Sequence, residues 1–141
     1  MRFVDSNVFL YSFLKAKKSL TPKEQQIKNE ARKIVKSVED GERVSTTTSH
    51  LSEILNIIET GIGLKESLAF LAWAVSSENL ILHPVTEQDY ARALPLANRH
   101  QISANDALAI HTMRRNNIAQ IYTFDRHFEH LEGLTKLPKL R

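Results

Sequence analysis

Four acidic residues of this 141-residue chain have types and positions that could support metal chemistry. Asp5 directly follows the apolar pair Phe3-Val4, and Asp125 follows a later apolar run. Glu53 falls in the early turns of one expected helix, and Asp106 falls in the first turn of another. Carboxylate oxygens are the ligands that Mg²⁺ and Mn²⁺ prefer, whereas Zn²⁺ prefers His or Cys. Attack of a metal-activated water on a phosphodiester bond is the reaction that matches such a set.

Taken singly, each acid also has a purely structural interpretation. Asp5 and Asp125 could cap the elements that follow them, and Asp106 could favour the positive end of its helix. Glu53 could be an ordinary solvent-facing residue, although position 50, three residues before it, is His rather than the Ser or Thr of a capping box. Both interpretations stay open for each acid on its own.

The helix around Asp106 favours the metal interpretation. Its residues are small or apolar on nearly every side, which is typical of a helix buried between a sheet and its neighbours. A carboxylate on such a helix must be paired, protonated or bound to a cation, because an isolated buried charge is very costly. The nearest bases in the sequence, Arg114 and Arg115, lie more than two turns further on. A bound cation is therefore the simplest explanation.

The elements that must position these acids alternate along the chain. Apolar runs predict short strands at 3–4, 43–47, 80–85, 119–124 and 134–137. Helical spacing predicts helices at 8–14, 22–40, 51–58, 64–75, 87–100 and 103–116. The strands lack in–out alternation, which is typical of a parallel sheet covered on both faces. We therefore expect one α/β domain over residues 1–141, a three-layer sandwich with a central, mostly parallel sheet flanked by helices.

This architecture predicts where the acids meet. Open parallel sheets bind ligands outside the carboxyl ends of their strands. Asp5 and Asp125 end strands, Glu53 lies in the early turns of the helix that follows the strand at 43–47, and Asp106 lies in the first turn of the helix that begins near Ser103. All four could therefore converge on one end of the sheet. Clustered carboxylates repel one another and have raised pKa values unless a divalent ion compensates them.

Composition excludes several classes of protein. The hydrophobic fraction of 42% and the charged fraction of 25% are ordinary for a soluble globular protein, and no apolar run is long enough to span a membrane. The chain has no Cys, which excludes disulfides and thiolate metal sites and is compatible with the cytosol. No N-terminal targeting segment is expected. The formal charge of +3 permits binding to a polyanion, with Arg114 and Arg126 as candidate nucleic-acid contacts, although bases on solvated helix faces would look the same.

Two other kinds of site are not predicted. The six His residues form no HExxH motif and no pair with a carboxylate on one helix face, so none is assigned to a metal. Four Gly in the whole chain cannot supply a glycine-rich phosphate loop.

Four motifs, in order, resemble those of a known family. They are Asp5-Ser6-Asn7, Ser52-Glu53-Ile54, Asn105-Asp106-Ala107-Leu108-Ala109-Ile110 and Thr123-Phe124-Asp125-Arg126-His127-Phe128. Together they resemble a PIN domain, and most of all the toxin component of bacterial and archaeal VapBC toxin–antitoxin pairs. The resemblance extends from residue 2 to about residue 130.

The resemblance implies a sheet between helices and a Mg²⁺- or Mn²⁺-dependent endoribonuclease. It implies catalytic roles for Asp5, Glu53, Asp106 and Asp125, with the three Asp residues as metal ligands. Supporting roles near Asp5 and Asp125 would fall to Asn7 and Thr123. It also implies an RNA substrate, a cognate antitoxin protein that blocks the acidic pocket, a homodimer and a cytoplasmic location. The polar stretch 15–29 could be an RNA-contacting clamp or only a surface loop.

Two other functions remain open. Asp5-Ser6-Asn7-Val8 approximates the Asp-x-Asp strand end of haloacid-dehalogenase-type phosphatases, in which Asp5 would be the nucleophile, but position 7 is Asn and no partner Lys is placed. Alternatively, a PIN-like module could bind RNA or a protein without cutting. The complete set of four acids argues against this second alternative.

Overall fold

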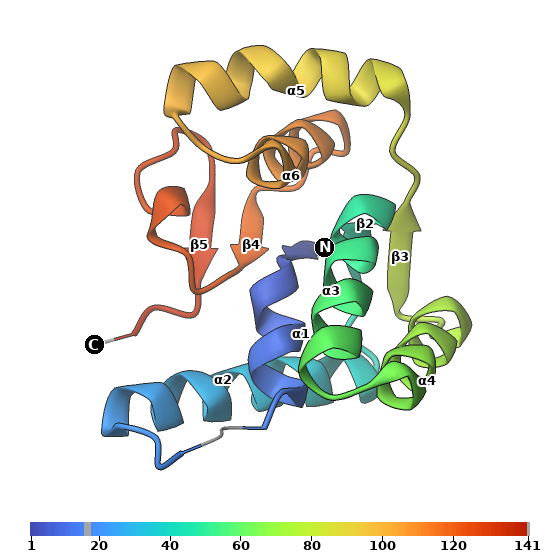
Figure 1. The fold of residues 1–141 in the computed structure, drawn as a ribbon. Coiled ribbons are helices and arrows are strands. Elements are labelled where there is room, and N and C mark those ends of the chain that lie inside the picture. The colour runs from blue at the N-terminus through green and yellow to red at the C-terminus, as the bar shows by residue number, and fades with distance from the viewer. Residues whose placement is uncertain (16–17, 141) are drawn as a thin grey trace.

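The structure is a computed structural model that describes residues 1–15 and 18–140 (Figure 1). Its five strands form one sheet in the order β3-β2-β1-β4-β5, and every pair of neighbouring strands is parallel. In chain order the elements are β1 (Arg2–Val4), α1 (Ser6–Phe13), α2 (Pro22–Glu39), β2 (Val44–Thr47), α3 (Thr48–Gly61), α4 (Leu64–Ser76), β3 (Leu80–His83), α5 (Glu87–His100), α6 (Ala104–Arg115), β4 (Gln120–Tyr122), the 3-10 helix η1 (Arg126–Phe128) and β5 (Thr135–Leu137).

The helices cover both faces of this sheet. In Figure 1, α1, α2, α3 and α4 lie on one side and α5 and α6 on the other. The expected three-layer α/β sandwich is confirmed, with a sheet that is wholly parallel. Strand β2 is buried at every position, as expected for a strand covered by helices on both faces of the sheet.

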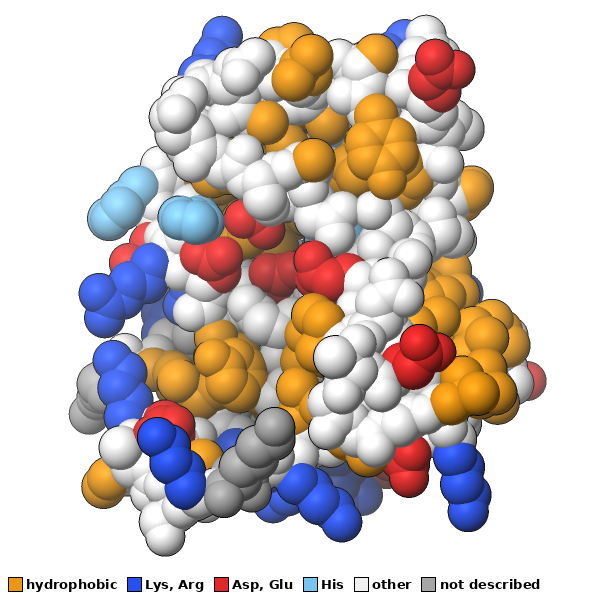
Figure 2. All heavy atoms as spheres, in the orientation of Figure 1, with side chains coloured by type: hydrophobic (Ala, Val, Ile, Leu, Met, Phe, Trp, Pro, Cys, Tyr) orange, Lys and Arg blue, Asp and Glu red, His pale blue; other side chains and the backbone are white. Residues whose placement is uncertain are grey.

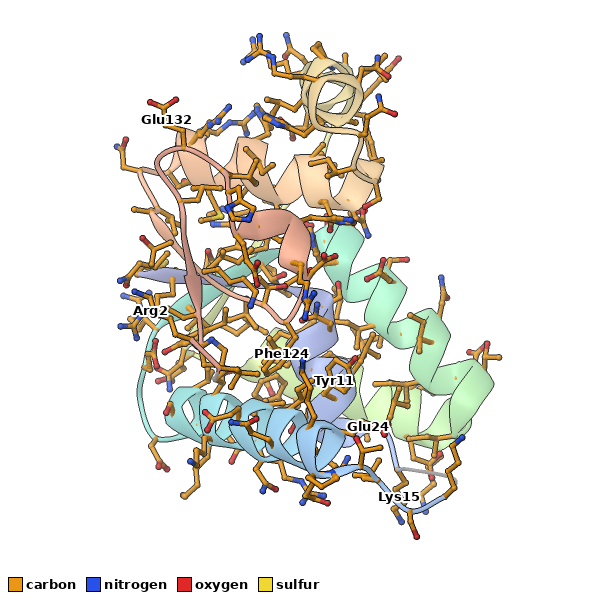
Figure 3. The ribbon with its side chains drawn as sticks, turned by 90° about the vertical axis from the view of Figure 1, so that its left-hand side faces the viewer. Arg2, Tyr11, Lys15, Glu24, Phe124 and Glu132 are labelled. Atoms are coloured by element: carbon orange, nitrogen blue, oxygen red, sulfur yellow. The ribbon has the colours of Figure 1, made fainter. Side chains whose placement is uncertain are left out.

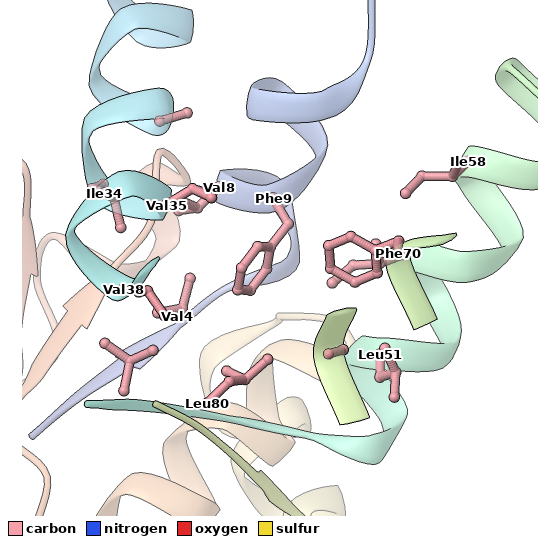
Figure 4. Close-up of a cluster of buried hydrophobic side chains, with 14 residues drawn as sticks. Val4, Val8, Phe9, Ile34, Val35, Val38, Leu51, Ile58, Phe70 and Leu80 are labelled. Carbon is pink, nitrogen blue, oxygen red and sulfur yellow. The ribbon is translucent and has the colours of Figure 1, made fainter. Parts of the chain in front are cut away.

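The larger hydrophobic cluster lies between the sheet and the first group of helices (Figure 4). Val4 of β1 and Val8 of α1 are fully buried there, and Phe9 contacts Phe70 of α4 edge-to-face at 5.5 Å between ring centroids. A second cluster on the opposite face joins α6 to β1 and β4 through residues that include Phe3, Ile110 and Ile121. Since both β1 and α6 are fixed by buried packing, the residues at their ends are held rigidly.

Local signals set the boundaries of the helices. Thr21 forms a capping box with Glu24 ahead of Pro22, so α2 begins where the proline predicts it. The chain leaves α2 through Gly41, whose φ of +126° is readily adopted only by glycine. Residues 22–29 of the polar stretch are therefore helical, and part of this stretch, 16–17, lies outside the described residues.

Two strands are shorter than their apolar runs. β3 stops at His83, before Pro84, and lies at the edge of the sheet, where a proline is tolerated. β4 ends at Tyr122 rather than at Phe124, because Thr123 and the residues after it turn toward the site described below. In the described part of the chain, no helix has the length and apolar character needed to span a membrane.

Candidate metal centre and catalytic site

Asp5 lies at the carboxyl end of the central strand β1, where the chain turns into α1. Its side chain is only 8% exposed, and Oδ1 accepts a hydrogen bond from the backbone N–H of Ser6 at 2.8 Å. Asp5 is thus the N-cap of α1, as its simple structural interpretation predicts. Its other oxygen, Oδ2, accepts a hydrogen bond of 2.8 Å from the hydroxyl of Thr123.

Thr123 connects the first and last motifs of the sequence. Its side chain is fully buried, and its Oγ1 donates to Asp5 while accepting from the backbone N–H of Asp125 at 3.0 Å and from Nδ2 of Asn7 at 3.2 Å. Asn7 in turn accepts from the backbone N–H of Phe124 at 3.3 Å. Asn7 and Thr123, which were predicted to support the site, therefore connect the turn between β1 and α1 directly to the segment after β4.

Asp106 and Asp125 approach the same place from α6 and η1. Ser103 caps α6 by accepting the backbone N–H of Asp106 at 3.1 Å, which places the Asp106 side chain at the N-terminal end of the helix. Asp125 caps η1 by accepting the backbone N–H of His127 at 2.9 Å. The His127 ring lies between them, with Nδ1 at 3.3 Å from Oδ2 of Asp106 and 3.2 Å from Oδ1 of Asp125.

A chain of hydrogen bonds connects Glu53 of α3 to α6. Its Oε2 accepts from Nδ2 of Asn105 at 3.1 Å, and Oδ1 of Asn105 accepts from the hydroxyl of Ser49 at 2.6 Å. Ser49 and Glu53 lie one turn apart on α3, so Asn105 of α6 bridges two positions of the facing helix. The half-buried Glu53 is therefore not a free solvent-facing residue.

The charges of these acids are mutually unfavourable without a cation. The pKa of Asp5 is raised to about 7, chiefly by burial and also by the charges of Asp106 and Glu53, against the opposing hydrogen bonds from Thr123 and the Ser6 N–H. Burial and the neighbouring charge of Asp125 also raise the pKa of Asp106, while His127 lowers it. Contacts through Thr123, Asn105 and His127 bring all four predicted acids together beside the carboxyl ends of β1 and β4. Figure 2 shows acidic side chains gathered in a hollow of the visible face, with His side chains at its edge.

The donor set fits a divalent cation. Among residues 1–15 and 18–140, the salt bridges of Lys and Arg side chains involve other acids, and none reaches Asp5, Glu53, Asp106 or Asp125. Buried and half-buried carboxylates without a Lys or Arg partner need another source of neutralising charge, such as a proton or a cation. Oxygen ligands of this kind suit a hard divalent ion.

Comparison with known proteins identifies the family. The sequence model of the PIN domain matches residues 2–134. The chain belongs to the PIN domain family. No curated protein sequence matches it significantly.

Solved structures with this PIN fold are distant in sequence. The VapC20 toxin of Mycobacterium tuberculosis, described as cleaving the sarcin-ricin loop, has a TM-score of 0.71 and 22% identity over 89% of this chain and 91% of its own. A toxin–antitoxin complex from Klebsiella pneumoniae has a TM-score of 0.66 and 11% identity over 96% of both chains. VapBC2 of Rickettsia felis, bound to a DNA fragment from its promoter, has a TM-score of 0.64 and 11% identity, again over 96% of both chains.

The two predicted nucleic-acid contacts of this PIN domain lie in different places. Arg126 follows Asp125 directly and is exposed in a hollow of about 490 Å³, where Lys23, Lys136 and Lys139 are the other bases and Glu129 is the acid. Arg114 is exposed in the last turn of α6, at the end opposite to Asp106. Only Arg126 adjoins the acidic group.

An aromatic pair lies beside this basic hollow. Tyr11 of α1 and Phe124 meet edge-to-face, with ring centroids 5.6 Å apart and planes at 89° (Figure 3). Phe124 lines the basic hollow, and Tyr11 is 45% exposed. Exposed aromatic rings next to bases are typical of surfaces that bind single-stranded nucleic acid.

Two His residues near the acids were assigned no role from the sequence. His127 contacts Asp106 and Asp125 as described above. His50 is fully buried, and its Nε2 has no hydrogen-bond partner among the residues that the structure describes and lies 3.8 Å from Oδ1 of Asp5. Its other nitrogen, Nδ1, lies 2.6 Å from Oγ1 of Thr47. The spacing of His127 two residues after Asp125 was a usable signal, whereas nothing in the sequence shows that His50 points at Asp5.

Proposed function

We propose that this PIN domain is a metal-dependent endoribonuclease and the toxin of a toxin–antitoxin pair. The observation that carries the proposal is the meeting of Asp5, Glu53, Asp106 and Asp125 at one edge of the sheet, although more than a hundred residues separate the first from the last. Family membership supports the proposal, because the four acids coincide with the four motifs of the resemblance.

Asp5, Asp106 and Asp125 would hold Mg²⁺ or Mn²⁺. A bound divalent ion lowers the pKa of water and stabilises negative charge on a phosphate under attack. Thr123 and the Ser6 N–H fix both oxygens of Asp5, so this ligand needs little reorganisation. Glu53, which Asn105 orients, is placed to accept a hydrogen bond from the attacking water.

The surroundings of the acids suit a polynucleotide better than a small phosphomonoester. The hollow beside Arg126 offers bases for backbone phosphates, and the pair formed by Tyr11 and Phe124 offers a surface for bases. The phosphatase alternative is weaker, because no Lys pairs with Asp5 in the described ranges.

The remaining expectations concern partners and place. An antitoxin protein, a homodimer and a cytoplasmic location stay predictions for this chain, and the toxin–antitoxin complexes with the same fold support the antitoxin partner. Exposed apolar side chains on α4 and α5, including Leu68 (53% exposed) and Leu94 (60% exposed), offer surface for such contacts.

A cleavage assay tests the proposed activity. Purified protein is incubated with single-stranded RNA and Mn²⁺ or Mg²⁺, and with EDTA. We expect metal-dependent internal cleavage that Asp106→Asn reduces by more than about 100-fold, beyond the 10–100-fold typical of residues that only support a metal site. Asp40→Asn, an exposed acid at the end of α2, is the matched control and should cleave normally. RNA binding without cleavage would favour the non-catalytic module, and release of phosphate from a monoester would favour the phosphatase.

A further inference from the structure

We propose that His127 is a direct ligand of the divalent ion through Nδ1, and that it makes the site prefer first-row transition ions, Mn²⁺ among them, over Mg²⁺. This inference rests on the proposed metal-dependent function. His127 is not one of the four predicted acids, and no role is predicted for it from the sequence.

The ligand atoms have the spacing of a coordination sphere. Nδ1 of His127 lies 3.3 Å from Oδ2 of Asp106 and 3.2 Å from Oδ1 of Asp125. One donor atom from each of the three residues fits within a common distance of 4.8 Å. Two ligands at right angles around an ion with bonds of about 2.1 Å lie about 3.0 Å apart, so little movement would bring the three atoms onto one ion.

The backbone already directs the His127 ring toward the acids. The first turn of η1 is closed by the hydrogen bond of 2.9 Å from the His127 N–H to Asp125. The next residue, Phe128, is fully buried in the second hydrophobic cluster and anchors the turn. His127 is therefore held beside Asp125 and Asp106 by the chain, although its side chain is 56% exposed.

A single proton on Nδ1 of His127 cannot form good hydrogen bonds to both carboxylates. Nδ1 carries at most one hydrogen, which cannot be directed fully at two carboxylate oxygens at once. A cation placed between Nδ1 and the two oxygens would attract all three atoms. The same position of Nδ1 leaves Nε2 on the opposite side of the ring, where it can keep its hydrogen.

A nitrogen ligand changes which divalent ion the site prefers. Mg²⁺ favours oxygen ligands and near-ideal octahedral geometry, so it gains little from an imidazole. First-row transition ions bind N/O sites more strongly, and their affinity rises from Mn²⁺ along the Irving–Williams order. A site with an imidazole and carboxylates therefore favours Mn²⁺ over Mg²⁺ more than a site with carboxylates alone.

Pulsed electron paramagnetic resonance of bound Mn²⁺ tests the ligand directly. Electron spin echo envelope modulation detects the ¹⁴N nucleus of a coordinated imidazole. We expect this modulation in the wild-type protein and its loss in His127→Gln. By calorimetry, His127→Gln should weaken Mn²⁺ binding about 10-fold and Mg²⁺ binding less than about 2-fold. His130→Gln, an exposed His three residues away, is the matched control and should behave as the wild type.

The outcomes separate this inference from the proposed function. Bound Mn²⁺ without ¹⁴N modulation in the wild type, or modulation that persists in His127→Gln, would overturn the role of His127 and leave the metal-dependent function standing. Equal losses of Mn²⁺ and Mg²⁺ affinity in His127→Gln would overturn the preference. Failure of the wild type to bind either ion would contradict the proposed function itself.

Discussion

Asp5 shows most clearly how single residues are set for metal binding. It is buried, two hydrogen bonds fix its oxygens, and neighbouring acids add negative charge around it. A carboxylate in such a place is destabilising when it is ionised and alone. The fold tolerates it because a proton or a divalent ion can neutralise it, and only the ion supports catalysis.

The raised pKa of Asp5 should be visible in the pH dependence of the free energy of unfolding. Its folded pKa of about 7 exceeds its unfolded value, so its stabilising contribution is complete below about pH 4 and is lost as the pH rises through 7. Burial lowers the pKa of His50 to about 4, so its contribution is complete above about pH 6.5 and is lost as the pH falls through 4. The two effects oppose each other over the same range.

In Asp5→Asn, the pH dependence of stability that comes from His50 should therefore no longer be offset by Asp5. In EDTA, the free energy of unfolding of this variant should rise with pH between 4 and 6.5, by about 3 kcal/mol from His50, while that of the wild type changes less. Urea denaturation at several pH values measures both. Equal slopes for the two proteins would contradict the raised pKa of Asp5.

Thr123 gives a second test at this scale. Thr123→Val keeps the shape but removes the hydroxyl that donates to Asp5 and accepts from Asp125 and Asn7. We expect Mn²⁺ affinity to fall about 10- to 100-fold, as for other groups that orient metal ligands. Thr123→Ser keeps the hydroxyl and should lose far less. Calorimetric titration with Mn²⁺ compares the two variants, and equal affinities would refute the orienting role.

At the scale of elements, much of the arrangement follows from the sequence. Short apolar runs without alternation predict buried parallel strands. Because the carboxyl ends of parallel strands lie at the same edge of a sheet, Asp5 and Asp125 are expected to meet there. Pro84, which follows β3, is compatible with the edge position of this strand. The contacts between elements do not follow in this way. The bridge from Asn105 to Glu53 and the approach of His127 to Asp106 depend on how α3, α6 and η1 pack, and local sequence does not encode side-chain directions across elements.

A half-buried ion pair that ties α5 to α6 offers a test of element packing. Asp89 of α5 accepts hydrogen bonds from His111 and Arg115 of α6, and with Thr86 it completes the capping box of α5. These contacts hold the pKa of Asp89 well below its usual range, chiefly through the backbone N–H of Thr86. The helix pair in turn carries Asp106 at the start of α6.

Asp89→Ala should lower the free energy of unfolding by about 2 kcal/mol, since it removes a cap and leaves buried polar groups unpaired. Glu87→Ala, an exposed acid in the same first turn, should change it by less than about 0.5 kcal/mol. Urea denaturation at pH 7 measures both variants. A change as small as that of Glu87→Ala would show that the ion pair does not stabilise the helix pair.

At the scale of the whole molecule, the acidic group lies beside a hollow lined mainly by bases. The net charge of +3 is small, yet the hollow beside Asp125 collects Arg126, Lys23, Lys136 and Lys139, with Glu129 as its acid. A phosphate backbone lying in this hollow would pass directly beside the acidic group, which otherwise repels a polyanion. In the proposed function, this arrangement would let one surface bind RNA and an adjacent one cut it.

RNA binding should depend on salt through these bases. With EDTA present, Arg126→Ala and Lys139→Ala should each reduce the slope of log K against log salt by about 0.7, the value for one lost phosphate contact on a single strand. Lys65→Ala on α4 is the control and should keep the wild-type slope. Fluorescence anisotropy over a range of salt concentrations measures the slopes. Unchanged slopes in the two hollow variants would place the RNA elsewhere.

Diffraction from crystals grown with Mn²⁺, recorded at the manganese absorption edge, tests the central claim most directly. We predict an anomalous peak within about 2.5 Å of carboxylate oxygens of Asp5, Asp106 and Asp125, lost in Asp106→Asn. The absence of a peak among these acids at saturating Mn²⁺, or a peak only at another place on the molecule, would contradict the account.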